Sequence, residues 1–175
     1  MKTVKIVSCD ERYALAILAI LNEAIVTSTA LYDYVPRQPS AMEAWFGNKK
    51  KGNYPVIGAE AEDGSLMGFA SYGPFRNFPA YKYSIEHSVY VEKSFRGKGI
   101  AKKLMLELIE SAKKQGYHMM IGGIDSTNEA SIRLHQALGF THCAKIRHAG
   151  FKFGRWLDLD FYQLLLPTPE HPVDG

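Results

Sequence analysis

The sequence is poor in cysteine, in long apolar runs and in excess charge of either sign. Its 175 residues contain two cysteines, Cys9 and Cys143, which belong to no CxxC or Cys/His cluster. Neither a disulfide framework nor a zinc site is therefore expected, and both thiols are predicted to be small buried side chains. No apolar run approaches the ~20 residues that a membrane-spanning helix needs, and the first residues lack the apolar core of a signal peptide. These absences predict a cytoplasmic protein with no metal site and no membrane partner.

The charge balance favours no polyanionic partner. The chain has 21 Lys and Arg against 18 Asp and Glu, a net charge of +3. So small an excess does not by itself indicate nucleic acid. A nucleic-acid binder that uses Arg96, Lys98, Lys102 and Lys103 is therefore the last-ranked hypothesis, and it predicts binding with a steep salt dependence.

Strand and helix patterns alternate along the chain in the manner of one mixed α/β domain. Strands are predicted at 4–7, 54–60, 66–72, 84–91, 119–124, 140–146 and 156–166. Helices are predicted after Asp10, after Ser40 and over 98–115. A fourth is predicted over 126–139, with Ser126 as its cap, because Ser126 and Glu129 have the spacing of a capping box. The order β-α-α-β-β-β-α-β-α-β-β contains no internal repeat and no Ser/Gly linker. We expect a central, mostly antiparallel mixed sheet flanked by helices in one domain over residues 1–166, and a polar tail over 167–175 that frays.

A basic, glycine-rich segment, Arg96-Gly97-Lys98-Gly99, lies between the strand that ends at Val91 and the long helix that follows. Two familiar phosphate loops do not fit it. A Walker A loop requires GxxxxGK followed by Ser or Thr, whereas here Lys98 precedes Gly99 and no hydroxyl follows. A dinucleotide fingerprint requires GxGxxG or GxGxxA, whereas the last of these positions is Lys102.

The segment nevertheless has the physical character of an anion site. The N–H groups at the start of a helix have no intrahelical acceptor, and the helix dipole favours negative charge there. Glycines allow a close approach of the backbone, and Arg96, Lys98 and Lys102 add positive charge. A diphosphate is a suitable guest. Taken alone, the segment is equally consistent with a turn whose basic residues serve solubility.

The motif Arg96-x-x-Gly99-x-Ala101, which follows Val89-Tyr90-Val91, resembles the acetyl-CoA pyrophosphate loop of the GCN5-related N-acetyltransferases. Three further segments, IEHSVYV, SIRLHQALGF and GFKFGRWLDLDFYQL, are similar to the phosphinothricin and methionine sulfoximine acetyltransferase branch of that family. The resemblance extends from the first strand to about Leu166. Ala101 departs from the glycine that is common in the motif, and alanine is expected to be tolerated there because the position is helical.

The resemblance implies acetyl-CoA as cosubstrate, no metal, and a homodimer. The pantetheine arm of acetyl-CoA would pair with backbone groups of the strand that ends at Val91 and would contact Asn128. The pyrophosphate of acetyl-CoA would bind backbone amides of the glycine loop. The cofactor residues so implied are Val89, Tyr90, Val91, Arg96, Gly97, Lys98, Gly99, Ile100, Ala101, Lys102 and Asn128. Glu86 matches the carboxylate proposed in this branch as general base, and His135 matches a histidine also proposed as catalytic.

A general base is required because an amine attacks a thioester only as the free base, and an α-amine is largely protonated at neutral pH. Strict alternation places Glu86 on the same face of its strand as Ser88, and His87 on the opposite face. Without the resemblance, an exposed or ion-paired carboxylate is the simpler interpretation of Glu86. His87 is interpreted as structural. His135 has apolar residues at same-face helical spacing, so a structural role fits it as well as a catalytic one.

The acceptor is expected to bind the aromatic loop over residues 75–83. Arg76 can grip a carboxylate or phosphinate with two hydrogen bonds, although a surface arginine is an equal alternative. The pocket residues predicted on this basis are Phe75, Arg76, Tyr81 and Tyr83.

Three classes of function therefore remain open. The first is N-acetylation of a small amino-acid-like amine such as phosphinothricin, methionine sulfoximine or methionine sulfone, with another amino acid, a polyamine or a peptide N-terminus as alternative acceptors. The second is a CoA-binding module without catalysis, in which Glu86 is only structural. The third is the nucleic-acid binder.

Overall fold

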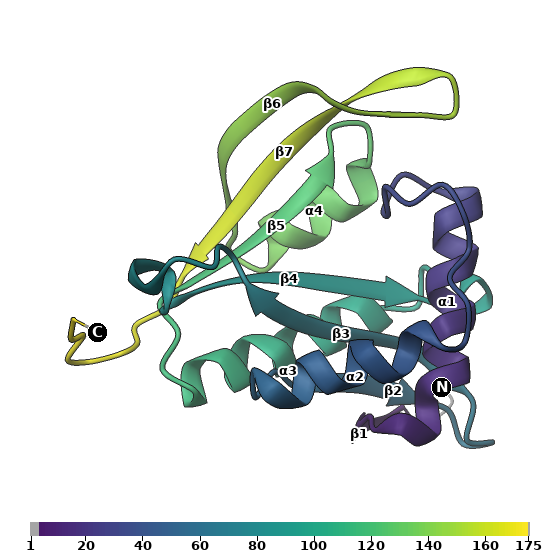
Figure 1. The fold of residues 1–175 in the computed structure, drawn as a ribbon, viewed down its shortest axis with the longest axis horizontal. Coiled ribbons are helices and arrows are strands. Elements are labelled where there is room, and N and C mark those ends of the chain that lie inside the picture. Colours follow the sequence, from purple (N-terminus) through teal and green to yellow (C-terminus); the bar gives the residue numbers. More distant parts are fainter. Residues whose placement is uncertain (1–3, 175) are drawn as a thin grey trace. The chain divides into compact units, whose positions relative to one another are not determined.

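The computed structural model describes residues 4–174, and within them the chain forms seven strands and four α-helices in the predicted order (Figure 1). The strands are β1 (Lys5–Ser8), β2 (Val56–Glu60), β3 (Leu66–Pro74), β4 (Ser84–Val91), β5 (Met119–Asp125), β6 (Thr141–Lys152) and β7 (Arg155–Leu165). The helices are α1 (Ala14–Thr27), α2 (Ala41–Lys51), α3 (Ile100–Lys114) and α4 (Glu129–Ala137). The sheet has the order β1-β2-β3-β4-β5-β7-β6, in which β4 and β5 are parallel. The predicted mixed α/β class is confirmed.

Two compact units make up this fold, and each has its own interior. The first contains the chain up to Tyr72 and residues Ser88–Leu108. In it, β1, β2 and β3 pair antiparallel. Apolar residues of α1 and α2, among them Ile17, Leu21 and Phe46, form one core with Leu66 and Phe69. Burial of these side chains is what fixes both helices on the strands, because non-polar area removed from water is the main stabilising contribution.

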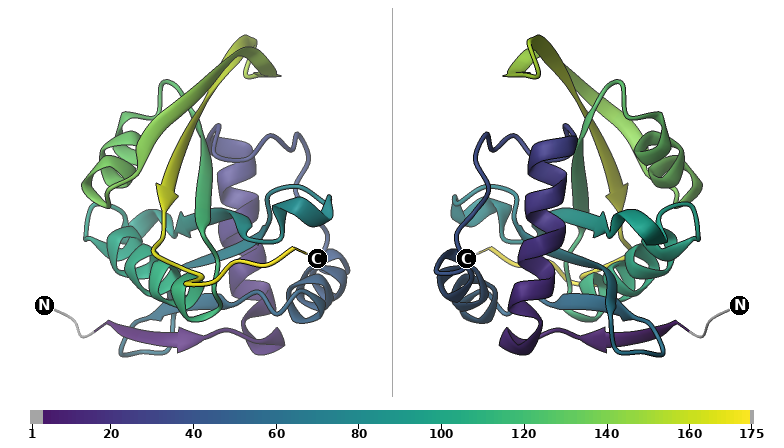
Figure 2. Two further views of the ribbon diagram at one scale, coloured as in Figure 1. Left: turned by 90° about the vertical axis from the view of Figure 1, so that its left-hand side faces the viewer. Right: turned by 90° about the vertical axis from the view of Figure 1, so that its right-hand side faces the viewer.

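The second unit contains Gly73–His87 and the chain from Ile109 onwards. Here the first part of β4, Ser84–Glu86, pairs in parallel with β5, and β5 pairs antiparallel with β7. The hairpin formed by β6 and β7 extends past the end of β5, as Figures 1 and 2 show. Most of β6 is exposed, so the hairpin presents a long surface to solvent.

Several boundaries differ from the sequence predictions for local reasons. Helix α4 begins at Glu129 and is capped by Asn128, whose side chain accepts from the Ser131 N–H; the predicted cap, Ser126, lies before the helix. Asp125 causes this shift because its carboxylate accepts from the Thr127 N–H at 2.8 Å and holds a turn there. Strand β6 continues to Lys152 rather than Ile146.

Two predictions of burial and order were wrong. Cys9 is buried as expected, but Cys143 is exposed on β6. The tail after Pro167 does not fray at its start, because the Thr168 carbonyl lies 2.9 Å from Nδ1 of His118 and the Thr168 hydroxyl donates to the Tyr117 carbonyl. The tail is therefore tied to the second unit.

Candidate active site

The glycine loop has the open backbone that an anion site requires. After β4 come a short 3₁₀ turn over Lys93–Phe95 and then Gly97 and Gly99, whose φ angles of 75° and 76° lie in the left-handed region. A Cβ added at either glycine would meet no atom within 4 Å. Helix α3 begins directly afterwards at Ile100. Two glycines with open space beside their Cα atoms thus precede a helix N-terminus, an arrangement that fits a pyrophosphate.

The basic side chains of the loop are mostly engaged with the protein. The Arg96 Nε–H donates to the Val91 carbonyl at 3.0 Å, and its guanidinium pairs with Glu23 of α1. The Lys98 ammonium donates to the Ser94 carbonyl at 2.8 Å. Both side chains therefore hold the loop in shape. The sequence did not predict that Arg96 would contact the Val91 carbonyl or pair with Glu23.

We predict that Gly99→Ala raises the KM for acetyl-CoA about tenfold and changes kcat little. The left-handed conformation costs an L-residue roughly 1–2 kcal/mol, so the loop would relax away from its binding geometry. Initial rates at varied acetyl-CoA measure this. Gly47→Ala is the matched control, because Gly47 also has open space around it but lies in α2 without a positive φ. A Gly99→Ala variant with wild-type KM would contradict an anion role for the loop.

Glu86 lies on the exposed face of β4, between the buried residues Ile85 and His87. The predicted alternation is thus present at these positions. Its Oε1 lies 3.7 Å from where a Cβ on Gly123 of β5 would stand, an ordinary van der Waals distance, so the carboxylate lies beside β5. Desolvation by surrounding protein atoms raises the pKa of Glu86, and the positive charge of Arg76 partly opposes that rise. The carboxylate is therefore more basic than an ordinary surface carboxylate.

Three of the four predicted acceptor-pocket residues contact one another, and one of them, Arg76, acts electrostatically on the Glu86 carboxylate. The Arg76 guanidinium lies over the Phe75 ring at 5.0 Å, and the Phe75 and Tyr81 rings meet edge to face at 5.7 Å. The Phe75 N–H donates to the Ser84 carbonyl at 3.2 Å, which anchors the loop on β4. A cation, two aromatic rings and a carboxylate of raised pKa are thus grouped in the second unit.

The fourth predicted pocket residue, Tyr83, is engaged by the C-terminal tail. Its hydroxyl accepts from the Val173 N–H at 3.1 Å and lies 3.3 Å from the Val173 carbonyl. A hollow of about 470 Å³ lies between the two segments and is lined by Pro79, Ala80, Lys82 and Tyr83 on one side and by residues 172–174 on the other. Tyr83 therefore supports the aromatic loop from the tail side.

His135 is buried in α4 and contacts a second histidine that the sequence did not connect with it. The Nε2 atoms of His135 and His87 are 3.0 Å apart, and the two rings are stacked with centroids 4.9 Å apart. The other nitrogen of His135, Nδ1, lies 2.7 Å from the Ser131 carbonyl. Both ring nitrogens of His135 are thus occupied. Because the two histidines are 48 residues apart, no spacing rule could have predicted their contact.

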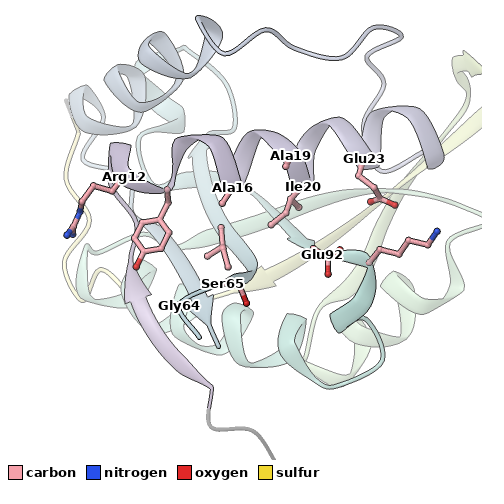
Figure 3. A pocket seen from close by; sticks show the side chains of 11 residues that line it. Arg12, Ala16, Ala19, Ile20, Glu23, Gly64, Ser65 and Glu92 are labelled. Carbon is pink, nitrogen blue, oxygen red and sulfur yellow. The ribbon is translucent and has the colours of Figure 1, made fainter. Parts of the chain in front are cut away.

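Another hollow of about 470 Å³ lies along α1 in the first unit (Figure 3). Ala16, Ala19 and Ile20 form its wall on the helix, and Glu23 and Glu92 stand at one end. None of the predicted site residues lines it. Across residues 4–174, no group of three or more His, Cys, Asp or Glu side chains is placed to hold a metal ion, and no helix is long and apolar enough to cross a membrane.

Comparison with known proteins supplies an independent line of information. A model of the Acetyltransferase (GNAT) family matches residues 20–140. An L-methionine sulfoximine/L-methionine sulfone acetyltransferase of Pseudomonas aeruginosa is 44% identical over 157 residues, which is 89% of this chain and 91% of that protein. The L-amino acid N-acyltransferase MnaT of Escherichia coli is 41% identical over 157 residues, 90% of this chain and 91% of its own length.

The similarity extends to solved structures. A phosphinothricin acetyltransferase of Sinorhizobium meliloti, determined in complex with acetyl-CoA, superimposes with a TM-score of 0.92 at 33% identity. The match covers 97% of this chain and 92% of that one.

Proposed function

Because the chain belongs to the GNAT family of acetyltransferases, we propose that it acetylates the amino group of a small amino-acid-like acceptor with Glu86 as general base. Acetyl-CoA-dependent N-acetylation is supported by the family, by the names of the relatives, which are an acetyltransferase and an N-acyltransferase, and by the acetyl-CoA bound in the Sinorhizobium meliloti structure. The acceptors we propose are methionine sulfoximine, methionine sulfone or phosphinothricin. The observation that carries the proposal is the grouping of Glu86 with Arg76, Phe75 and Tyr81.

Acetyl-CoA supplies an activated acetyl thioester, and the chain has groups suited to hold it. We assign the pyrophosphate to the amides of Gly97–Lys102, whose glycines leave the backbone uncovered. We assign the pantetheine arm to backbone groups of Val89–Val91, which lie outside the stretch of β4 that pairs with β5, and to Asn128. Arg96 then contributes by fixing the loop through Glu23 and Val91.

The transfer we propose is direct. Glu86 takes a proton from the acceptor's ammonium, directly or through a water molecule, and the free amine then attacks the thioester carbonyl. A carbon–nitrogen bond forms, the carbon–sulfur bond breaks, and the sulfur leaves with the electron pair. The second proton that the attacking nitrogen loses neutralises the thiolate, so the products are the amide and the CoA thiol. Backbone N–H groups of β4 stabilise the oxyanion, and side-by-side binding of both substrates supplies much of the rate.

Arg76 is proposed to bind the acceptor's carboxylate or phosphinate, and Phe75 and Tyr81 to pack on its side chain. The guanidinium geometry suits an oxyanion with two acceptor oxygens. An ordinary amino acid is the leading alternative acceptor, because the relative MnaT is named an L-amino acid N-acyltransferase. A polyamine lacks the anionic group that Arg76 would recognise.

Thiol release from acetyl-CoA against a panel of amines tests this proposal. The panel holds methionine sulfoximine, methionine sulfone, phosphinothricin, ordinary amino acids, a polyamine and a short peptide. Saturable turnover with the amino-acid analogues is expected. Turnover confined to the polyamine or peptide would reject the proposed acceptor class, and acetyl-CoA binding without any turnover would favour the non-catalytic module.

The expected cytoplasmic location stays a prediction.

We also propose that the protein is a homodimer assembled through the β6–β7 hairpin. Residues 146–156 at the far end of the hairpin expose four large apolar side chains, and the Trp156 ring packs only on its hairpin neighbours His148 and Phe151 among the ring contacts described. An exposed apolar patch of this kind is typical of an interface. The four residues are Ile146, Phe151, Phe153 and Trp156.

The double variant Phe153→Ser/Trp156→Ser is predicted to shift the protein from dimer to monomer, because large aromatic side chains carry much of an interface's stability. Light scattering after size exclusion measures the mass. Leu15→Ser is the matched control, since Leu15 is 70% exposed on α1. A dimer that persists in the double variant would place the interface elsewhere.

A further inference from the structure

We infer that His87 and His135 form one neutral hydrogen-bonded pair that positions Glu86, and that neither imidazole takes the acceptor's proton. The inference deepens the proposed function and rests on Glu86 as its base. It assigns a role to His87, which the resemblance left without one, and it changes the role of His135 from proton transfer to positioning.

The hydrogen-bond partners determine where the protons lie. A carbonyl oxygen can only accept, so the His135 Nδ1, 2.7 Å from the Ser131 carbonyl, must carry a hydrogen. In the neutral ring the His135 Nε2 then holds a lone pair, and the His87 Nε2 at 3.0 Å must donate to it. A single proton therefore lies between the two Nε2 atoms. His87 keeps its remaining lone pair on Nδ1, which is buried without a hydrogen-bond partner.

The surroundings of the pair favour the neutral state. His87 and His135 are 8% and 2% exposed. The Phe140 ring meets both imidazoles edge-on, at 5.5 Å and 5.1 Å, and the Tyr162 ring lies 6.4 Å from that of His135. Burial lowers the pKa of His87 to about 3, and it also lowers the pKa of His135. Protonation of His135 at Nε2 would set two N–H groups against each other across the 3.0 Å contact, and protonation of His87 would place an N–H at Nδ1, which is buried without a partner.

A glycine on β5 makes room for the pair. A Cβ on Gly122 would stand 2.5 Å from the His87 Nε2 and 3.3 Å from the His135 Nε2. The imidazoles therefore lie directly against the bare backbone of β5. Through this arrangement β4, β5 and α4 are joined at one buried point.

The point of attachment lies next to the proposed base. His87 follows Glu86 in β4, and the two side chains leave the strand on opposite faces. When the His87 ring is held on one face of β4, the direction in which the Glu86 side chain projects from the opposite face is fixed as well. His135 cannot accept the acceptor's proton at Nε2 while that atom accepts from His87, and its Nδ1 already carries a hydrogen.

A double-mutant cycle of His87→Leu and His135→Leu tests the inference, with acetyl-CoA and methionine sulfone as substrates. Each single variant is expected to lower kcat about 10- to 100-fold, the effect of a misplaced catalytic group. The KM for acetyl-CoA should stay within about threefold of wild type, and the double variant should be no slower than the slower single variant, because the residues act as a unit.

The pH dependence of kcat/KM separates positioning from proton transfer. In His135→Leu the loss of activity at low pH should persist, because Glu86 still sets it. If the loss of activity at low pH disappeared in His135→Leu but remained in Glu86→Gln, His135 would be the base and the inference would be overturned. Unchanged kcat in both single variants with lowered melting temperatures would also overturn it, leaving the pair a purely structural contact.

Nitrogen NMR of the wild-type protein tests the pair even if the variants fail to fold or the acceptor class is wrong. The expected spectrum shows both imidazoles neutral from pH 6 to 8, with the hydrogen on Nε2 of His87 and on Nδ1 of His135. An imidazolium signal from either residue in that range would overturn the inference. Absence of turnover with every amine in the panel would instead reject the proposed function and leave this spectrum unaffected.

Discussion

Glu86→Gln is expected to lower kcat by about 10²- to 10⁴-fold, the range typical for removal of a general base. Glutamine has nearly the same shape as glutamate but cannot take a proton from the acceptor. Because glutamine keeps the size and polarity of the side chain, the affinity for acetyl-CoA should not change. Calorimetric titration of acetyl-CoA and initial rates with methionine sulfone measure the two quantities separately.

The pH dependence of wild-type activity provides a second test of Glu86 as the general base. The base works only when deprotonated, so activity must fall as the pH drops through the pKa of Glu86. Desolvation by surrounding protein atoms raises that pKa above the ordinary carboxyl value, and the loss should begin at a correspondingly higher pH. Glu107→Gln is the matched control, because Glu107 is an exposed glutamate on α3. Equal turnover of Glu86→Gln and wild type would remove Glu86 from the mechanism.

Gly122→Ala is expected to have the largest effect on stability, a loss of roughly 2–4 kcal/mol in the free energy of unfolding. Its methyl group would lie 2.5 Å from the His87 Nε2, so the ring must move within a packed interior. The movement breaks the hydrogen bond to His135 and leaves a buried nitrogen without a partner. Chemical denaturation measures the loss, and kcat should fall as it does in His87→Leu.

Gly123→Ala is the matched control on the same strand. There a methyl group would lie 3.2 Å from the Leu159 Cδ1 and 3.4 Å from the Phe161 Cε1, both at the ends of side chains. A leucine methyl can move by a few tenths of an ångström, so we expect a loss below about 1.5 kcal/mol. Equal losses in the two variants would mean that Gly122 has no special relation to the histidines.

Much of the fold could be predicted because its signals are local. The apolar stripe of α3, the alternation in β4 and the glycines at 97 and 99 each depend on neighbouring residues. The same local reasoning failed where two signals competed. Ser126 and Glu129 have the spacing of a capping box. In the structure, however, the carboxylate of Asp125 accepts from the Thr127 N–H and forms a turn, and Asn128 caps the helix instead.

The parts of the site that escaped prediction depend on contacts between distant residues. Nothing near Arg96 indicates that its guanidinium pairs with Glu23, 73 positions earlier. Tyr83 likewise is engaged by Val173, 90 positions later, in a tail expected to fray. His135 could be singled out by resemblance, but its partner His87 could not. A pattern along the chain identifies candidate groups, whereas their partners follow only from the folded arrangement.

Transfer of a labelled acetyl group tests the central claim most directly. The protein is incubated with ¹³C-acetyl-CoA and methionine sulfone, and the products are identified by mass spectrometry. The account predicts stoichiometric N-acetyl methionine sulfone carrying the label, at a rate that collapses in Glu86→Gln. Free labelled acetate with unmodified methionine sulfone, or an undiminished rate in Glu86→Gln, would contradict it.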